Sequence, residues 1–314
     1  MTGRLPDTSY AAPRLSVIVF VRNAVNSVER ALKSVVNYPN SSVELLVLDG
    51  GSTDGTVEII RRYQDRIAFW RTFPDGGPIY AVKEGVERAT GDAICLLPAD
   101  DWLEPGALDY IVREFAADPD LDVLSCGIRF IHYESDERLV VDAEVLHPND
   151  LEFTIHNVVR QVISGGRFIR RRVYQRMGGF DPAYSISNDL DFFIRVILAR
   201  PKTRVLSRLV YTYWRNPESR TMGRDPDMDM AMMRDNIRLA AHYMTDPSAR
   251  PDEQLELRGF HGRCCARLVW MSMVRGKLVE AVSVLRQAIA KNHLWPVQVI
   301  YWSFRHVLGS KRFV

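Results

Sequence analysis

Adjacent carboxylates, Asp100-Asp101, directly follow a short apolar run. Two neighbouring negative charges repel one another unless a cation or hydrogen-bond donors satisfy them. Mg²⁺ and Mn²⁺ prefer oxygen ligands and commonly take one or two carboxylates together with phosphate oxygens. The pair therefore suits a divalent metal ion that is presented to a diphosphate. Acidic residues also favour the start of a helix, and a helix opening near Pro105 would explain the pair equally well.

A second polar segment, Asp49-Gly-Gly-Ser-Thr-Asp-Gly-Thr56, follows another apolar run. Asp, Gly and Ser are standard turn residues, and Ser52 or Thr53 would also cap a following helix. Taken alone, this segment indicates an ordinary turn. Together with Asp100-Asp101 it indicates more, because ligands of an open parallel sheet bind at the carboxyl ends of its strands. Two acidic segments at that edge predict a cleft for a ligand.

The elements that must position these segments alternate along the first part of the chain. Apolar runs predict strands over 15–21, 43–48, 67–70, 93–97 and 121–130, and helical spacing predicts helices over 28–36, 57–63, 79–88 and 105–117. This alternation predicts a parallel sheet with helices on both faces. After residue 132 the rhythm breaks, and helices are predicted over 170–177 and 190–198, from Pro226, and from Phe260 to the end. The two prolines of the 245–252 stretch suit a boundary between domains.

Several classes of protein are excluded by composition and motifs. The 314 residues are 46% hydrophobic and 25% charged, which is typical of a folded globular chain, and a net charge of +2 argues against bulk attraction to nucleic acid. The first strand is followed by Val21-Arg-Asn-Ala rather than G-x-G-x-x-G, which disfavours a nicotinamide cofactor. The chain has no G-x-x-x-x-G-K-[ST] motif and therefore no P-loop for a triphosphate.

The cysteines and the N-terminal sequence bear on the compartment. The four cysteines form no C-x-x-C pair, so neither a structural zinc nor a disulfide framework is predicted and a reducing compartment fits best. Residues 1–13 lack a signal-peptide pattern, and no run reaches the ~18 apolar residues of a membrane span. We expect a cytoplasmic protein, at most peripheral on the inner face of the cytoplasmic membrane.

Charge is distributed unevenly between the two ends of the chain. Residues 258–314 contain ten Lys and Arg and one acid, Glu280, so this tail carries +9 and residues 1–257 carry −7. The tail also contains aromatic residues, among them Trp270, Trp295 and Trp302. A basic segment with aromatic residues suits attachment to an anionic membrane surface. A helical subdomain that packs on the rest of the protein or on a second subunit explains the same pattern.

Several motifs in this order and spacing resemble glycosyltransferase family 2, an inverting family with the GT-A fold. The matching pieces are Ser16-Val-Ile-Val with Asn23, the signature Val47-Leu-Asp-Gly-Gly-Ser-Thr-Asp-Gly-Thr56, Ala89-Thr-Gly-Asp92 before Leu97-Pro-Ala-Asp-Asp101, and Gly178-Gly-Phe-Asp181 before Asn188-Asp-Leu-Asp-Phe-Phe-Ile-Arg195. The resemblance covers roughly residues 15–213. It implies an α/β fold of GT-A type, Rossmann-like, with a mostly parallel central sheet flanked by helices and a C-terminal helical extension.

The resemblance also implies roles for individual residues. Asp49 would accept a hydrogen bond from the nucleotide base, and the strand end at Val21 and Asn23 would shape the base pocket. Asp100 would contact the ribose or the sugar, and Asp101 would bind Mg²⁺ or Mn²⁺. Asp189 would be the general base, with Asp191 as the alternative. Asp75, in its Gly-Gly turn, is expected near the nucleotide sugar, although turn chemistry explains it equally well.

Some positions depart from the family pattern or have plainer explanations. Asn188 stands where the family commonly has Glu. Lys83 stands where related chains often have Asn; it could pair with phosphate, but a solvated position paired with Glu87 is the preferred interpretation. The acceptor is expected at 164–167 and 211–216, where aromatic rings can stack on a sugar. His156 is interpreted as a structural side chain.

The predicted organisation is a tail over 1–13, a catalytic domain over 14–222 and a helical basic extension over 223–314. Within the catalytic domain, about 14–130 would bind the nucleotide sugar and about 131–222 the acceptor. The predicted activity is metal-dependent, inverting transfer of a sugar from a nucleoside-diphosphate sugar to a saccharide or lipid-linked acceptor, with UDP favoured and GDP and dTDP open. Alternatives are a regulatory or scaffold member that binds nucleotide without turnover and, more distantly, a nucleotidyltransferase. A homo-oligomer is possible, and no nucleic-acid partner is expected.

Overall fold

The computed structural model describes residues 14–38, 42–134, 137–160, 165–216 and 225–291. These residues form two compact units. The first unit contains 14–151, 165–176 and 202–214 of the described chain, and the second contains 152–164, 177–201 and the remainder from 215. The predicted 1–13 tail and the residues after 291, including Trp295 and Trp302, lie outside the described part.

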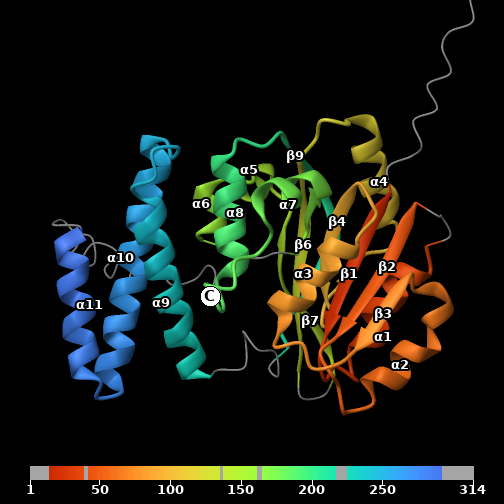
Figure 1. The fold of residues 1–314 in the computed structure, drawn as a ribbon, viewed down its shortest axis with the longest axis horizontal. Coiled ribbons are helices and arrows are strands. Elements are labelled where there is room, and N and C mark those ends of the chain that lie inside the picture. The colour runs from red at the N-terminus through yellow and green to blue at the C-terminus, as the bar shows by residue number, and fades with distance from the viewer. Residues whose placement is uncertain (1–13, 39–41, 135–136, 161–164, 217–224, 292–314) are drawn as a thin grey trace, which may run out of the picture. The chain divides into compact units, whose positions relative to one another are not determined.

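The first unit is built on one nine-stranded sheet (Figure 1). Its strands are β1 (Leu15–Val21), β2 (Val43–Asp49), β3 (Phe69–Thr72), β4 (Ala93–Pro98), β5 (Trp102–Leu103), β6 (Val123–Tyr133), β7 (Leu139–Val145), β8 (Arg167–Arg170) and β9 (Thr203–Trp214). The order along the sheet is β3-β2-β1-β4-β8-β6-β9-β5, and β7 pairs with β6. Strands β3, β2, β1 and β4 are parallel, whereas β8, β5 and β7 pair antiparallel with their neighbours.

The helices of the first unit alternate with its strands along the chain. They are α1 (Val28–Val36), α2 (Thr56–Arg62), the 3₁₀ turn η1 (Gln64–Arg66), α3 (Pro78–Arg88), α4 (Ala107–Ala117), α5 (Pro148–Leu151) and α7 (Arg171–Met177), of which the last ends in the second unit. Pro78 opens α3, because its missing N–H leaves no helical bond unmade there. Helix α4 begins at Ala107 rather than at Pro105.

The core of the first unit lies on both faces of the parallel strands. Val17, Ile18 and Val19 of β1 are all fully buried, as expected for a central strand covered on two sides. Gly85 of α3 lies so close to Ile18 that a Cβ atom there would be 2.5 Å from its side chain. Alternate side chains of a strand point to opposite faces, so Val17 and Val19 face away from α3. This packing fixes the strand ends that carry the polar loops.

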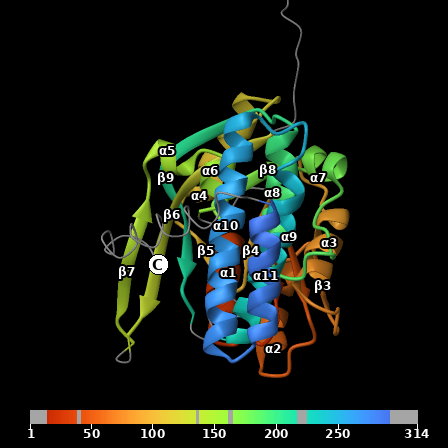
Figure 2. The ribbon, with the colours of Figure 1, turned by 90° about the vertical axis from the view of Figure 1, so that its left-hand side faces the viewer.

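The second unit is helical and is described separately. It contains α6 (Ile155–Val158), α8 (Asn188–Leu198), α9 (Pro226–Tyr243), α10 (Pro251–Val274) and α11 (Leu278–Lys291). Helices α10 and α11 run side by side, joined by a turn at Gly276 (Figure 2). The interpretation of 245–252 as a domain boundary is wrong. This stretch connects α9 to α10, and these two helices pack against one another within the same unit.

The predicted fold class is confirmed, and the C-terminal helices are present. The strands β5, β7, β8 and β9 were not predicted, because each is short or carries charged residues without a clear period. The predicted domain boundaries at residues 13 and 222 lie outside the described residues and stay predictions. None of the described helices is long and apolar enough to cross a membrane.

Candidate active site

The loops after β1 and β2 are joined to one another by hydrogen bonds. The backbone N–H of Asn23 donates to the Ser52 hydroxyl at 2.7 Å, and the Asn23 amide oxygen accepts from the Thr53 N–H at 2.9 Å. Asn23 has a left-handed backbone with φ of 50°, which Asn tolerates better than most residues. The Val21 carbonyl, at the end of β1, accepts from the Gly50 N–H at 2.8 Å. Val21 and Asn23 therefore fix the path of the β2 loop.

Asp49 is fully buried at the end of β2, and its carboxylate accepts several bonds from its own loop. One oxygen accepts from the N–H groups of Gly51 and Ser52, at 3.1 and 3.0 Å, and also from the Thr72 hydroxyl; the other oxygen accepts from the Ser52 hydroxyl. Asp49 thus closes the turn and ties it to β3. Its predicted contact with a nucleotide base would add to these bonds or replace one of them.

Asp75 lies beside the same turn. Its carboxylate pairs with the Arg71 guanidinium at 2.9 Å and accepts from the Gly77 N–H at 3.0 Å. Gly50 and Gly51 allow this close approach: Gly51 has a φ of 80°, and a Cβ atom there would lie 2.9 Å from the Pro74 nitrogen. Arg71 also donates to the Asp49 carbonyl and to Glu84, so one buried arginine links the ends of β2 and β3.

The adjacent carboxylates after β4 differ sharply in their surroundings. Asp101 is 2% exposed, and its carboxylate accepts from the Tyr211 hydroxyl at 2.5 Å and from the Trp214 N–H at 3.0 Å. Burial raises the pKa of Asp101 to about 7, although the two hydrogen bonds act against that rise. Asp100 is partly exposed, and its carboxylate accepts from the Ser27 hydroxyl at 3.1 Å. Asp100 is therefore the better placed of the two to meet a ligand.

An arginine within an aromatic cluster lies close to this pair. The Arg30 guanidinium is 3.8 Å from the ring centre of Trp102 and 5.2 Å from that of Trp214, and it donates to the Tyr133 hydroxyl at 2.5 Å. Its positive charge lowers the pKa of Asp101, against the larger effect of burial. The cluster joins α1 to the ends of β5, β6 and β9.

A divalent cation fits this site only with ligands from outside the protein. Among the described residues, no group of three His, Cys, Asp or Glu side chains could hold a metal ion. The chain offers Asp100, with the buried Asp101 next to it. Such a donor set matches Mg²⁺ or Mn²⁺ sites in which one or two carboxylates act together with substrate phosphates. The residues therefore fit a metal ion that binds with a diphosphate.

The carboxylates of α8 belong to the second unit. Asp189 lies in the first turn, and its carboxylate accepts from the Leu190 N–H at 2.8 Å. Asp191 is buried and pairs with Nη2 and Nε of Arg195, at 2.7 and 2.9 Å, and with the Tyr243 hydroxyl at 2.8 Å. Burial and this bond raise the pKa of Tyr243. Because Asp191 is held by these partners, Asp189 is the better candidate for a base.

The remaining predicted residues have clear places. His156 pairs with Glu256 at 2.9 Å, in agreement with a structural role. Lys83 is exposed on α3, where Glu84 pairs with Arg88. Residues 161–164 lie outside the described part. Tyr211 does not offer its ring to a sugar, because it is fully buried.

The structure adds Arg71, which the sequence did not single out, and it gives Tyr211, expected at the acceptor, a supporting role beside Asp101 instead. Gly165 packs against the Tyr211 ring, where a Cβ atom would be 2.3 Å from it. The glycine pair at 165–166 was a usable signal of such a close approach. No local pattern could show that Tyr211 reaches Asp101 across 110 residues.

The fold is that of an α/β protein with acidic loops at the carboxyl ends of its parallel strands, and comparison with known proteins identifies its family. The family model described as "Glycosyl transferase family 2" matches residues 16–178, which is more than half of the chain. The chain therefore belongs to glycosyltransferase family 2.

Relatives with curated names agree. An uncharacterized glycosyltransferase of Mycobacterium tuberculosis (strain H37Rv) is 27% identical over 192 residues, which cover 60% of this chain and 70% of that protein. The chondroitin synthase of Pasteurella multocida (strain Pm70) is 26% identical over 187 residues, 59% of this chain but only 19% of that larger protein. These matches support glycosyltransferase activity.

Solved structures share the fold. The Pyrobaculum calidifontis mannosyltransferase PcManGT, in complex with GDP-Man and Mn²⁺, has a TM-score of 0.60 at 20% identity and covers 98% of this chain and 83% of that one. Staphylococcus aureus TarS 1–349 with UDP-GlcNAc has a TM-score of 0.58 at 17% identity and covers 92% of both chains. At such identities the likeness establishes the GT-A fold.

Proposed function

We propose that this glycosyltransferase is metal-dependent and inverting. It transfers a sugar from a nucleoside-diphosphate sugar, with UDP favoured, to a hydroxyl of a saccharide or lipid-linked acceptor. The observation that carries the donor part is the edge of the first unit's sheet. There the ends of β1, β2 and β4 bring Asn23, the Ser52 loop and Asp100 to neighbouring strands of one parallel sheet.

Each part of this edge has a task in the proposed reaction. The loops fixed by Val21, Asn23 and Asp49 hold the base and ribose, with Asp75 beside the turn. Asp100 would hold the metal ion, with Asp101 behind it as a buried support, which reverses the order expected from the sequence. A bound Mg²⁺ or Mn²⁺ would offset the negative charge that builds up on the leaving nucleoside diphosphate. Rigid loops favour transfer because little reorganisation is needed during reaction.

The role of Asp189 as general base rests on the resemblance of its segment to the family pattern. A carboxylate that accepts the proton of the acceptor hydroxyl lets that oxygen attack the anomeric carbon directly, and direct attack inverts the configuration. Asn188 removes a charge beside Asp189 that the family commonly has. A member that binds nucleotide without turnover is therefore the second candidate function.

The donor site is tested by calorimetric titration of UDP, GDP and dTDP, each with and without Mn²⁺. The proteins are the wild type, Asp100→Asn, Asp101→Asn and the control Asp65→Asn, which changes an exposed carboxylate of η1. We expect one nucleotide to bind, with metal increasing its affinity in the wild type and the control. Asp100→Asn should remove most of the metal effect, whereas Asp101→Asn should reduce it less.

Two outcomes would contradict the proposal. Binding of none of the three nucleotides would remove the donor site. If the metal increased nucleotide affinity equally in the wild type and in both carboxylate variants, neither Asp100 nor Asp101 would take part in metal binding. If Asp101→Asn alone lost the metal effect, the assignment from the sequence would replace ours.

A further inference from the structure

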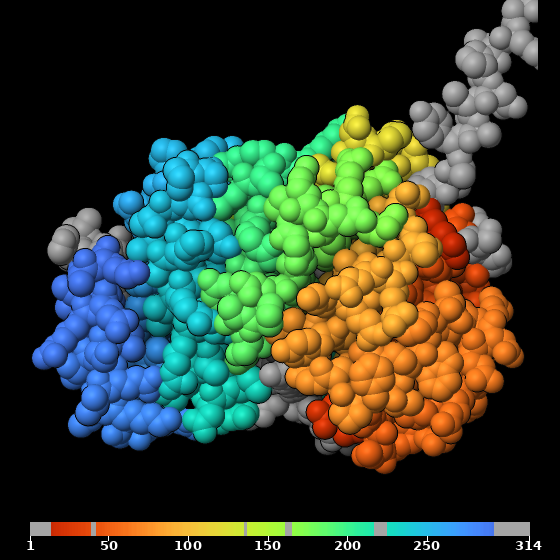
Figure 3. All heavy atoms as spheres, in the orientation of Figure 1, coloured from red at the N-terminus to blue at the C-terminus, as the bar shows by residue number. Residues whose placement is uncertain are grey.

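The turn between α10 and α11 is an exposed apolar end of the second unit. Every residue from Met273 to Val279 is exposed, and Val279 reaches 88%. Trp270 on α10 and Val282 on α11 extend this surface, at 65% and 45% exposed. In Figure 1 the turn forms one end of the helix pair, and in Figure 3 its side chains cover that end of the unit. We call the residues from 270 to 282 the α10–α11 tip.

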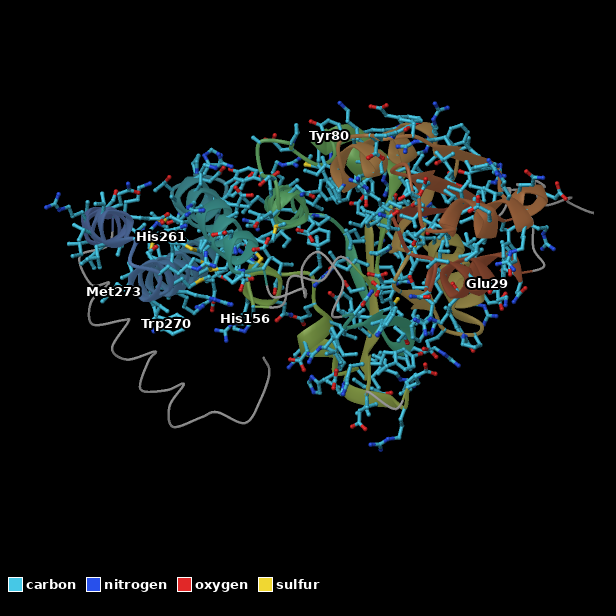
Figure 4. The ribbon with its side chains drawn as sticks, turned by 90° about the horizontal axis from the view of Figure 1, so that it is seen from below. Glu29, Tyr80, His156, His261, Trp270 and Met273 are labelled. Carbon is cyan, nitrogen blue, oxygen red and sulfur yellow. The ribbon has the colours of Figure 1, made fainter. Side chains whose placement is uncertain are left out.

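The apolar side chains of the tip are aligned by helical spacing. Trp270, Met273 and Val274 are three and four residues apart and so share a face of α10, and Leu278 and Val282 share a face of α11. Trp270 and Met273 project from the outer side of α10, whereas His261 lies among the helices (Figure 4). Large apolar side chains gathered at such a point are a contact surface rather than chance exposure.

Cations surround this apolar surface. Arg275 and Lys277 flank Gly276 in the turn, and the exposed Arg267 and Arg286 continue the two helix faces. The acids near them are few: Asp227 pairs with Arg275 and with Lys277, and Asp229 lies 3.9 Å from Arg267. Over 258–291, seven Lys and Arg stand against Glu280 alone, a net charge of +6. The sequence that follows, 292–314, contains three more Lys and Arg and no acid.

We propose that the α10–α11 tip docks on an anionic lipid bilayer. Trp270, Met273 and the aliphatic side chains of the turn enter the boundary between headgroups and acyl chains, and the surrounding cations lie at the level of the headgroup phosphates. A lipid surface fits better than a second copy of the chain, because two tips of the same positive charge repel one another. A bilayer of negative charge complements both the apolar and the basic parts.

Lipid docking is measured by flotation of the full chain with vesicles, without donor or acceptor. The vesicles contain phosphatidylcholine alone or an equimolar mixture with phosphatidylglycerol. The test variant is Val274→Asp/Val279→Asp, since both side chains are exposed and make little demand on folding. The matched control is Leu255→Asp, which is 66% exposed on the same helix but near its other end.

We expect the wild type and Leu255→Asp to float with the anionic vesicles and not with the neutral ones. The double variant should partition about tenfold more weakly, because it places two charges in the apolar contact. Equal flotation of the double variant and the control would overturn the proposal. So would sedimentation analysis that shows a wild-type dimer, lost in the double variant, without vesicle binding. Nucleotide titration of the same variants is a separate measurement. We expect their nucleotide affinity to equal that of the wild type, because the α10–α11 tip is not part of the proposed donor site.

Discussion

Asp101 in the first unit and Asp191 in the second are both buried carboxylates that accept a hydrogen bond from a tyrosine. The Tyr211 hydroxyl donates to Asp101, and the Tyr243 hydroxyl donates to Asp191. Each has a less buried aspartate within two residues, Asp100 or Asp189. They differ in countercharge: Asp191 has Arg195 in direct contact, whereas Arg30 affects Asp101 without a hydrogen bond to it.

This difference in countercharge shows that two buried aspartates can have different roles. Asp191, with a full ionic partner, stabilises the start of α8 by holding an arginine that also donates to the carbonyls of Met177 and Gly179. Asp101, without such a partner, has a pKa raised to about 7 by burial. In each region the partly exposed neighbour, Asp100 or Asp189, is the residue proposed above to act in the reaction. Predictions from this comparison separate turnover from stability.

The largest expected effect is on turnover in Asp189→Asn. We expect transfer to fall by about 10²–10⁴-fold, the usual contribution of a general base, while nucleotide affinity and unfolding temperature stay near the wild type. The measurement is sugar transfer from the nucleotide sugar selected by calorimetry, together with a thermal melt. Transfer at the wild-type rate would refute the assignment of the base. Loss of nucleotide binding as well would indicate a structural role instead.

A loss of folding stability is expected from Asp191→Ala. Removing the Asp191 carboxylate takes the charged partner from Arg195, which is 23% exposed, and the acceptor from the Tyr243 hydroxyl. We expect a loss of about 2–3 kcal/mol, the usual value for hydrogen bonds to a charged group. Chemical denaturation of the variant gives the free energy of unfolding. Asp189→Ala is the matched control on the same helix, and we expect it to cost less than about 1 kcal/mol. Similar losses in the two variants would contradict the division of roles between them.

The sequence predicted the first half of the sheet better than the second for a physical reason. Strands β1, β2 and β4 are buried on both faces and read as continuous apolar runs, such as Leu15–Val21. Strand β7 has largely exposed side chains and β5 only two residues, so neither leaves a pattern. The same limit applies to the site. The loop residues could be predicted from turn chemistry, but the burial of Asp101 depends on Tyr211 and Trp214, far away in the sequence.

A buried histidine gives the second unit a dependence on pH. His261 is buried beside the Cys265 sulfur, and burial lowers its pKa to about 4. The unfolded chain binds the proton near pH 6.5 and the folded chain only near 4, so stability is full above the unfolded pKa and falls as the pH drops between these values. We expect a loss of about 2 kcal/mol from this group.

Comparison of wild type with His261→Gln isolates the contribution of His261. Free energies of unfolding are measured by denaturation from pH 7 to pH 4. The contributions of the carboxylates cancel in the difference between the two free energies. That difference should narrow as the pH falls, because only the wild type loses the contribution of His261. A constant difference over this range would mean that His261 does not titrate in the way its burial implies.

The smallest effects are expected from removal of the two tyrosine hydroxyls, and they test directly whether Asp101 and Asp191 differ in role. Tyr211→Phe and Tyr243→Phe should each cost about 1 kcal/mol of stability, the net value of one hydrogen bond. Only Tyr211→Phe should also weaken nucleotide binding in the presence of Mn²⁺, by about three- to fivefold, because Asp101 keeps just the Trp214 bond and stands next to Asp100. Asp191 keeps Arg195, so Tyr243→Phe should leave the titration unchanged. If both variants weakened nucleotide binding equally, the buried support behind Asp100 would have no special part in the donor site.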